Sequence, residues 1–412
     1  MNTRRILFVL LFIASSIAFA IALFFVFFKQ PTTDDTIPPR DGAPLGDGQA
    51  FPNAGLGQGG VIIDGGPDTL PPIGEIPRPS ELSPPTIDQR TQQLIADDIL
   101  NPQLVNGSQV QFYNQQDGKF YRRDEQGNIL PLSDTVFFNV ETVTWSGTGN
   151  EAILEYPDQA NIYYNFDTKK QVTLPRHWEN FSFSDQGNQI VAKSIGQSPE
   201  NRWLIVSNPD GSNTRLVEPL GTNADKVTVD WSPNQQMLAL SRTGDALGGN
   251  REEVLLIGQN GENFPSLIVE GRGMESRWAP NGNQLLYSVY NAENDFKPQL
   301  WIVSTDPTSI GAGRQVLNVD TWAHKCDFNP TNQRFVYCGV PEQLETGAGF
   351  QPAIANTIPD RLYRIDTQTG IQTEIMFDDD QTHTIESLFL SDDGSSLFFT
   401  DTQEDGLFEV AL

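Results

Sequence analysis

The amino-acid sequence predicts an all-β fold: a seven-bladed β-propeller made of four-stranded antiparallel blades. Three observations predict it. From residue 87 to the C-terminus, short β-rich runs alternate with turns rich in Gly, Asn, Asp and Pro, with hardly any helical periodicity. These runs form a unit that repeats at a spacing typical of propeller blades. The last unit lacks a strand, and an extra strand ahead of the first unit can replace it.

Each unit contains an apolar strand that ends in a large residue, followed by a tight turn. We call the large residue the anchor and expect it to pack between neighbouring blades. Successive anchors stand 40, 38, 48, 47, 50 and 62 residues apart. The anchors and their turns are Val105-Asn-Gly-Ser-Gln109, Trp145-Ser-Gly-Thr-Gly149, Phe183-Ser-Asp-Gln-Gly187, Trp231-Ser-Pro-Asn-Gln235, Trp278-Ala-Pro-Asn-Gly282, Phe328-Asn-Pro-Thr-Asn332 and Leu390-Ser-Asp-Asp-Gly394.

The third strand of the unit also recurs. It occurs seven times, and this number sets the predicted number of blades. It is followed in most units by a turn and a fourth strand. An eighth blade would need further strands inside the long sixth unit, where we interpret residues 340–359 as a loop insertion. The seven copies are KFYRRD, NIYYNF, RWLIVS, EVLLIG, QLWIVS, RLYRID and GLFEVA.

The two ends of the repeat region predict how the ring closes. The seventh unit stops at Leu412 after its third strand, so its outer strand is missing. Residues 90–96 resemble the fourth strands of other units, for example residues 169–174. We therefore expect the strand near residues 90–96 to complete the last blade. Radial stacking then covers both faces of every sheet and leaves only short edges.

Residues 6–28 form an uninterrupted apolar run without a charged residue. At roughly 1.5 Å per residue, such a helix can cross a bilayer core of about 30 Å. Arg4 and Arg5 precede it, so the positive-inside bias predicts a cytoplasmic tail of residues 1–5 and a single-pass cell-membrane protein whose propeller lies outside the cytoplasm. A cleaved signal peptide is the alternative, because Ala18-Phe-Ala20 resembles a cleavage site.

Residues 29–86 are predicted to be a disordered linker. The segment from residue 31 to residue 86 contains 12 prolines and 10 glycines but no sustained apolar periodicity, so it cannot bury a core. The linker separates the predicted transmembrane helix from the propeller, which is expected over residues 87–412. The formal net charge of −27 is spread along the chain and repels polyanions, so we expect no nucleic-acid partner.

The anchor-and-turn motif, clearest at Trp231 and Trp278, is followed by strands of the form "LY-x-hydrophobic-D". This combination resembles the WD-repeat-like units of the TolB propeller and of the propeller domains in the prolyl oligopeptidase and dipeptidyl peptidase families. The order of transmembrane helix, spacer and acidic propeller also resembles that of membrane-anchored exported bacterial propellers. The resemblance covers about residues 88–412 and implies a fold, but propellers host unrelated activities.

Four common hydrolase, nucleotide-binding and metal-binding motifs are absent, and the formal match of residues 55–60 to Gly-x-Gly-x-x-Gly lacks the strand and helix that a dinucleotide site needs. Gly-x-Ser-x-Gly, Walker A, His-Glu-x-x-His and Cys-x-x-Cys are all missing from the sequence. We therefore expect no cofactor and no metal, and predict a binding or scaffold propeller for an envelope protein, a peptide or a glycan. A propeller-type hydrolase or lyase, with a metal or acidic residues in the channel, stays open as the alternative.

The residues just ahead of each first strand should ring one end of the central channel, which we call the channel mouth. All three histidines fall four to seven residues before an anchor, and a mixed polar and aromatic set occupies the equivalent positions elsewhere. Such a mixture suits recognition of a peptide or a small polar ligand better than a repeated cofactor contact. The predicted ligand-binding residues are Asn139, His177, Asp225, Arg272, Trp322, His324 and His383.

Two further candidate sites come from acidic and sulfur-containing residues. Asp378–Asp380 and Asp392–Asp393 could hold calcium through oxygen ligands, although Asp is also favoured in turns for its own hydrogen bonds. Cys326 and Cys338 stand symmetrically about Asn332 in a predicted turn, which places them opposite each other across an antiparallel pair. We predict a structural disulfide between them, with two buried free thiols as the alternative.

Overall fold

A computed structural model describes residues 91–242, 247–248, 250–379 and 381–412. The predicted cytoplasmic tail, the transmembrane helix at residues 6–28 and the linker at residues 29–86 lie outside these residues. Within the described part of the chain, no helix is both long and apolar enough to cross a membrane.

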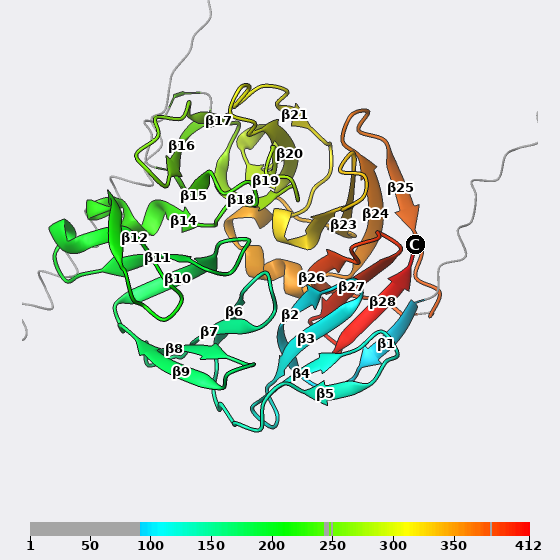
Figure 1. The fold of residues 1–412 in the computed structure, drawn as a ribbon. Helices are drawn as coiled ribbons and strands as arrows, with labels where there is room; N and C mark the ends of the chain where they lie inside the picture. The colour runs from blue at the N-terminus through cyan, green and yellow to red at the C-terminus, as the bar shows by residue number, and fades with distance from the viewer. Residues whose placement is uncertain (1–90, 243–246, 249, 380) are drawn as a thin grey trace, which may run out of the picture. The chain divides into compact units, whose positions relative to one another are not determined.

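Seven four-stranded antiparallel sheets surround a common centre, and each sheet is one blade of a β-propeller (Figure 1). The first strand of each blade lies innermost. Blade 1 contains β2 (Ile99–Val105), β3 (Gln109–Asn114), β4 (Lys119–Arg123) and β5 (Ile129–Pro131). Blade 2 contains β6 (Thr142–Trp145), β7 (Glu151–Glu155), β8 (Asn161–Asn165) and β9 (Lys170–Leu174). Blade 3 contains β10 (Trp178–Phe183), β11 (Ile190–Ile195), β12 (Arg202–Ser207) and β13 (Arg215–Pro219).

The remaining blades follow the same order around the ring. Blade 4 contains β14 (Val227–Val229), β15 (Met237–Ser241), β16 (Glu252–Gly258) and β17 (Leu267–Val269). Blade 5 contains β18 (Arg272–Trp278), β19 (Gln284–Tyr290), β20 (Gln299–Ser304) and β21 (Gln315–Val316). Blade 6 contains β22 (Cys326–Phe328), β23 (Phe335–Pro341), β24 (Asp360–Asp366) and β25 (Gln372–Ile375). Blade 7 contains β26 (Ile385–Leu390), β27 (Ser396–Asp401), β28 (Leu407–Ala411) and β1 (Thr91–Ile95).

Short 3₁₀ helices occupy several connections between strands. They are η1 (Pro199–Asn201), η2 (Gly221–Lys226), η3 (Ala292–Asn294), η4 (Ala323–Lys325), η5 (Ala348–Phe350) and η6 (Pro352–Thr357). The insertion predicted in the sixth unit runs between β23 and β24 and contains only η5 and η6, so it supplies no strands for another blade. The predicted seven-bladed propeller is confirmed.

The core lies between blades rather than inside one sheet. Each of seven clusters of buried apolar side chains joins two neighbouring blades. All seven predicted anchors are buried, at 0–9% exposure. Burying one large apolar side chain stabilises a fold by about 1.5–3 kcal/mol, so the anchors hold successive blades together.

The turn after each anchor is built from local hydrogen bonds. In blade 4, the Ser232 hydroxyl accepts the backbone N–H of Met237 at 2.9 Å. In blade 5, Gly282 has φ +70, and a Cβ added there would lie 2.7 Å from the backbone nitrogen of Asn234. Glycine is needed at this position both for the left-handed backbone and for the close approach of the neighbouring turn.

The ring closes in blade 7, where the N-terminal strand β1 pairs antiparallel with the C-terminal strand β28 (Figure 1). Thr91 lies opposite Val410 and Gln92 opposite Glu409. This is the place expected for the strand near residues 90–96. The chain ends of the propeller are therefore neighbours, and β1 is the point at which the preceding segment joins the ring.

The predicted disulfide is confirmed. Cys326 in β22 lies directly opposite Cys338 in β23, with their Cα atoms 4.1 Å apart, and the two sulfurs are bonded. Both residues are fully buried. The bond ties the innermost strand of blade 6 to its neighbour.

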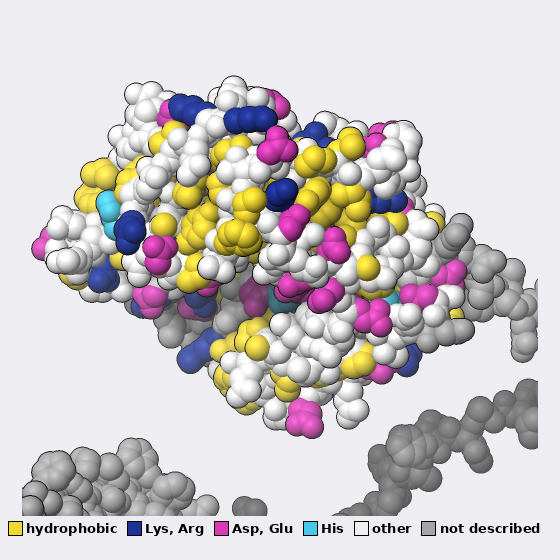
Figure 2. Space-filling model, turned by 90° about the horizontal axis from the view of Figure 1, so that it is seen from below, with side chains coloured by type: hydrophobic (Ala, Val, Ile, Leu, Met, Phe, Trp, Pro, Cys, Tyr) yellow, Lys and Arg dark blue, Asp and Glu magenta, His cyan; other side chains and the backbone are white. Residues whose placement is uncertain are grey.

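The outer rim of blade 1 carries exposed apolar side chains. Ile129 and Leu130 in β5, and Val136 and Phe138 in the following loop, are 41–64% exposed. Figure 2 shows the side of the molecule where β5 and β9 lie, and hydrophobic side chains gather across it. None of these four residues lines the central cavity described below.

Candidate functional site at the central channel

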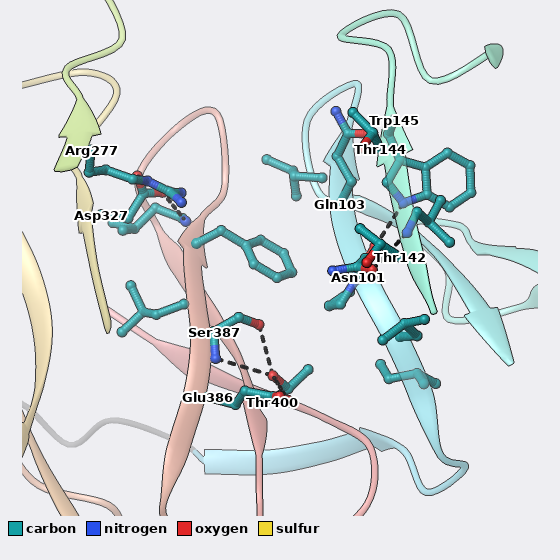
Figure 3. Close-up of a pocket in the computed structure, with 18 of the residues that line it drawn as sticks. Asn101, Gln103, Thr142, Thr144, Trp145, Arg277, Asp327, Glu386, Ser387 and Thr400 are labelled. Atoms are coloured by element: carbon teal, nitrogen blue, oxygen red, sulfur yellow. Dashed lines mark hydrogen bonds and ion pairs between the residues drawn. The ribbon is translucent and has the colours of Figure 1, made fainter. Parts of the chain in front are cut away.

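A cavity of about 750 Å³ lies among the innermost strands of the ring (Figure 3). It is lined mainly by β2, β6 and β26, which belong to blades 1, 2 and 7, with one side chain each from β18, β22, β27 and the turn after β26. Leu104, Val143, Leu388 and Phe389 give it an apolar surface, and polar groups lie among them. The cavity therefore offers both apolar contact and directional hydrogen bonding to a ligand.

An ion pair stands on the wall of this cavity (Figure 3). Arg277 Nη2 lies 3.1 Å from Asp327 Oδ1, and the other carboxylate oxygen of Asp327 accepts the backbone N–H of Leu390 at 3.1 Å. Arg277 is the only cationic side chain among the described residues that line the cavity. Because Asp327 links blades 5, 6 and 7, it holds the Arg277 guanidinium in a fixed position. The guanidinium has five N–H donors, so some of them remain available to a ligand.

The carboxyl group of Asp230, which directly follows β14, lies close enough to Arg277 to feel its charge. Burial raises the pKa of Asp230 to about 7, although the charge of Arg277 opposes this effect. A carboxyl group with this pKa can change its protonation state near neutral pH. The charge around Arg277 is therefore sensitive to pH in the neutral range.

The opposite wall is held together by hydrogen bonds between blades 1 and 2 (Figure 3). The carbonyl oxygen of Asn101 accepts the indole N–H of Trp145 at 2.7 Å, and its side-chain oxygen accepts the backbone N–H of Val143 at 2.9 Å. Asn101 has φ +45, a left-handed conformation that Asn adopts more readily than most residues. These bonds fix the shape of the wall.

The structure places the seven predicted ligand-binding residues at the starts of the first strands, but none of them lines the channel cavity. Asn139, His177, Asp225, Arg272 and His324 are exposed. Trp322 and His383 are buried, at 2% and 0% exposure. The role of these residues in ligand binding stays a prediction.

His177 lies at a second cavity, also of about 750 Å³. Blades 2 and 3 form this cavity where their first strands begin. Glu141, Glu155 and Glu179 line it together with Trp178. Burial raises the pKa of Glu155, and the charges of Glu179 and Glu141 raise it further. Glu179 also lies 3.5 Å from the buried amine of Lys193.

His324 connects blades 5 and 6. Its Nδ1 lies 2.6 Å from the carboxylate of Glu275 in β18. His383 instead lies inside blade 7 between Asp379 and Asp401. The three histidines therefore have separate environments.

Sequence reasoning missed the residues that do line the channel, although a signal for them exists. They include the residue immediately before the anchor, because neighbouring residues of a strand point to opposite faces and the anchor faces the adjacent blade. Five of the seven such residues line the cavity: Leu104, Thr144, Arg277, Asp327 and Phe389.

A buried pair between η4 and β24 was also missed. Lys325 Nζ lies 2.7 Å from Asp360 Oδ2, and both side chains are fully enclosed. Burial lowers the pKa of Lys325 and raises the pKa of Asp360 to about 6. The sequence signal is a charged residue directly before the buried strand that begins at Cys326.

The acidic candidates for calcium binding serve as hydrogen-bond acceptors, some within one turn and some between distant parts of the chain. The Asp393 carboxylate accepts N–H and O–H bonds from Ser395, which help to lower the pKa of Asp393 to about 2. Asp392 accepts the backbone N–H of Gly107 at 2.7 Å. Asp380 lies outside the described residues. Within those that are described, no group of three or more His, Cys, Asp or Glu side chains could hold a metal ion.

The sequence matches no protein-family profile and no curated protein. Among solved structures, oligogalacturonate lyase in complex with manganese has a TM-score of 0.54 at 13% identity, covering 78% of this chain and 93% of that chain. The β-propeller domain of Cps50 (Swd1) from Myceliophteria thermophila has a TM-score of 0.51 at 11% identity, covering 78% and 98%.

A chain of the mitotic checkpoint complex has a TM-score of 0.51 at 13% identity, covering 85% of this chain and 98% of that chain. At these identities, all three similarities concern the β-propeller fold alone. They include both a lyase and a propeller domain of another kind, and none of them identifies a TolB family.

Proposed function

We propose that this protein is a membrane-tethered binding or scaffold propeller outside the cytoplasm, which recognises a protein, peptide or glycan of the cell envelope at the cavity in its central channel. The observation that carries this proposal is the cavity of about 750 Å³ among the innermost strands. Ligand-binding pockets commonly have volumes of about 300–1,000 Å³ and combine an apolar lining with a few placed polar groups.

The hydrogen bonding of two carboxylates that line the channel supports recognition over acid–base chemistry by these two groups. Asp327 is paired with Arg277 and with a backbone N–H of blade 7, and Asp392 accepts a backbone N–H of blade 1. These carboxylates hold blades together. Arg277, with donors to spare, is the group that we expect to orient a carbonyl or carboxylate of the partner against the apolar wall.

The proposed location rests on the sequence and on one structural feature. The apolar run of residues 6–28 is long enough for a membrane anchor, and the linker of residues 29–86 would place the propeller about 40 Å from it as a flexible coil. The disulfide of blade 6 is typical of proteins kept in an oxidising compartment. The positive charges of Arg4 and Arg5 before the apolar run, together with the disulfide, favour a position outside the cytoplasm.

The experiment measures how tightly the soluble fragment 88–412 binds envelope proteins, peptides and glycans of the source cell. Thr144 lines the channel from β6, so Thr144→Trp should fill part of the cavity and weaken binding at least about tenfold, which corresponds to about 1.4 kcal/mol. Leu216 is 57% exposed on the outer strand β13, so Leu216→Trp is the matched control and should bind like the unchanged fragment.

Equal binding by the Thr144→Trp fragment and the unchanged fragment would contradict the proposal, as would equal loss in both tryptophan variants. Cleavage of a glycan by the fragment would favour the alternative of a propeller hydrolase or lyase. Thermal unfolding of each fragment separates a blocked channel from a disturbed fold.

A further inference from the structure

The side chain of His383, at the start of blade 7, is completely enclosed. Its Nδ1 lies 3.0 Å from Asp401 Oδ2 and its Nε2 lies 2.9 Å from Asp379 Oδ2. The rings of Phe377, Phe408 and Phe399 surround it, with centroids 4.7, 4.9 and 5.0 Å away. Water therefore has little access to the imidazole, and both of its nitrogens depend on protein partners.

This geometry requires a particular protonation state. A neutral imidazole carries one N–H, whereas the imidazolium carries two. Asp401 cannot rotate away, because its Oδ2 also accepts the backbone N–H of Thr384 and its Oδ1 accepts that of Gln403. Two ionised carboxylates can both be satisfied by His383 only when the ring is positively charged.

The segment around His383 also holds the strand that closes the ring. Asp378 Oδ1 accepts the backbone N–H of Thr91 at 2.5 Å, and Thr91 Oγ1 accepts the backbone N–H of Asp378 at 3.4 Å. Thr91 is the first residue of β1. Asp379, which bonds to His383, directly follows Asp378, so the position of one affects the position of the other.

We propose that the protonated His383 forms a clasp with Asp379 and Asp401 that keeps Asp378 bonded to β1, so that closure of the ring weakens as the pH rises. Deprotonation leaves one carboxylate facing a nitrogen lone pair. Asp379, whose side chain is 20% exposed, can move toward solvent, whereas Asp401 is fully enclosed. The movement of Asp379 then loosens the adjacent bonds between Asp378 and Thr91.

The charges around the clasp set the pH range. Burial alone would lower the pKa of His383, but the hydrogen bonds and charges of Asp401 and Asp379 outweigh it and raise the pKa above the ordinary value. The clasp is therefore complete below the pKa of an unfolded histidine and is lost as the pH rises through the higher folded value.

Two other charged groups lie near the clasp and must be separated from it in any titration. Asp360 donates its backbone N–H to the carbonyl of His383, and it is paired with Lys325. The pKa of Asp360 is raised by burial to about 6. The effect of His383 is therefore best measured above pH 6, where Asp360 changes its charge less.

Hydrogen exchange in the soluble fragment 88–412 tests the clasp. The quantity to follow is the exchange rate of β1 amides divided by that of amides in β13, the outer strand of blade 3, so that intrinsic pH effects cancel. We expect this ratio to rise as the pH increases, by about tenfold for each unit by which folding raises the pKa of His383. A ratio that stays constant in the unchanged fragment would overturn the proposal.

Asp379→Asn is the decisive variant. An asparagine amide can either donate to the bare ring nitrogen or accept from its N–H, so the clasp is satisfied in both protonation states. The exchange ratio of this variant should stay low at every pH. Asp134→Asn, at a residue whose side chain is 95% exposed, is the matched control and should keep the pH dependence of the unchanged fragment.

The state of the ring can also be observed directly. ¹⁵N-detected NMR of the fragment should show both nitrogens of His383 protonated at pH 6. A single N–H on the ring at that pH would overturn the proposal, and so would an Asp379→Asn variant whose exchange ratio still rises with pH. His177→Gln and His324→Gln should leave the ratio unchanged, because the other two histidines lie outside the clasp.

Discussion

The junction between blades 1 and 2 is aromatic. Phe120 from β4 contacts the rings of Phe137, Trp145 and Phe166, with centroids 5.7, 5.4 and 5.1 Å away. Edge-to-face and offset contacts of this kind add to the stabilisation that comes from burial alone. No residue of this aromatic group must change its charge on folding, so the junction holds by shape and by exclusion of water.

The junction between blades 6 and 7 combines apolar packing with buried charge. Lys325 and Asp360 form an ion pair at 2.7 Å, and the same carboxylate oxygen accepts the backbone N–H of Ile385 in blade 7 at 2.7 Å. His383 and Asp401 form a second buried pair at the start of the same blade. The other oxygen of Asp360 has no hydrogen-bond partner.

The two junctions differ in how they respond to their surroundings. The burial of apolar rings is independent of pH, whereas a buried ion pair depends on the presence of both partners and on their protonation. The charged junction borders blade 7, the blade inside which β1 pairs with β28 and closes the ring. The buried pair of His383 and Asp401 thus lies in the same blade as β1, the strand through which the chain enters the propeller.

The largest effect is expected at the aromatic junction. Phe120→Ala should lower the free energy of unfolding by about 3–5 kcal/mol, because a fully buried ring is lost and a cavity remains. The loss should be the same at pH 5 and pH 8. Urea unfolding of the fragment at both pH values measures it, and a loss that depended on pH would contradict the distinction between the junctions.

A somewhat smaller loss is expected at the charged junction. Lys325→Met should cost about 3 kcal/mol at pH 7.5, because the Asp360 carboxylate is left buried without its counter-charge. The cost should shrink at pH 5, since burial already raises the pKa of Asp360 to about 6 and the protonated carboxyl carries no charge. A second change, Asp360→Asn, should restore part of the stability at pH 7.5.

The smallest effect is expected at an ion pair on the surface of blade 6. Arg334 bonds to both carboxylate oxygens of Asp366, at 2.9 and 2.6 Å, but its side chain is 41% exposed. Arg334→Ala should cost less than about 1 kcal/mol, and added salt should reduce that cost. A cost equal to that of Lys325→Met would show that burial does not decide the strength of these pairs.

The candidate site could be predicted from the sequence only in part. Position along the repeat identifies which residues lie at the starts of the first strands. By this criterion His177 and His383 occupy equivalent positions in blades 3 and 7. One is exposed and the other is enclosed by Phe377, Phe399 and Phe408. The same repeat could have identified Arg277 and Asp327 as channel residues through their place before the anchors.

The sequence by itself determined the number of blades, the buried anchors, the strand that closes the ring and the disulfide of blade 6. All four follow from spacing within one unit or from counting units, because hairpins and turns depend on residues close in the chain. Only the tertiary structure decided that Lys325 meets Asp360, 35 residues away, and which polar groups face the channel. Those outcomes depend on how neighbouring blades cover each other, and the degree of burial, rather than the residue type, sets the energy and protonation of each charged group.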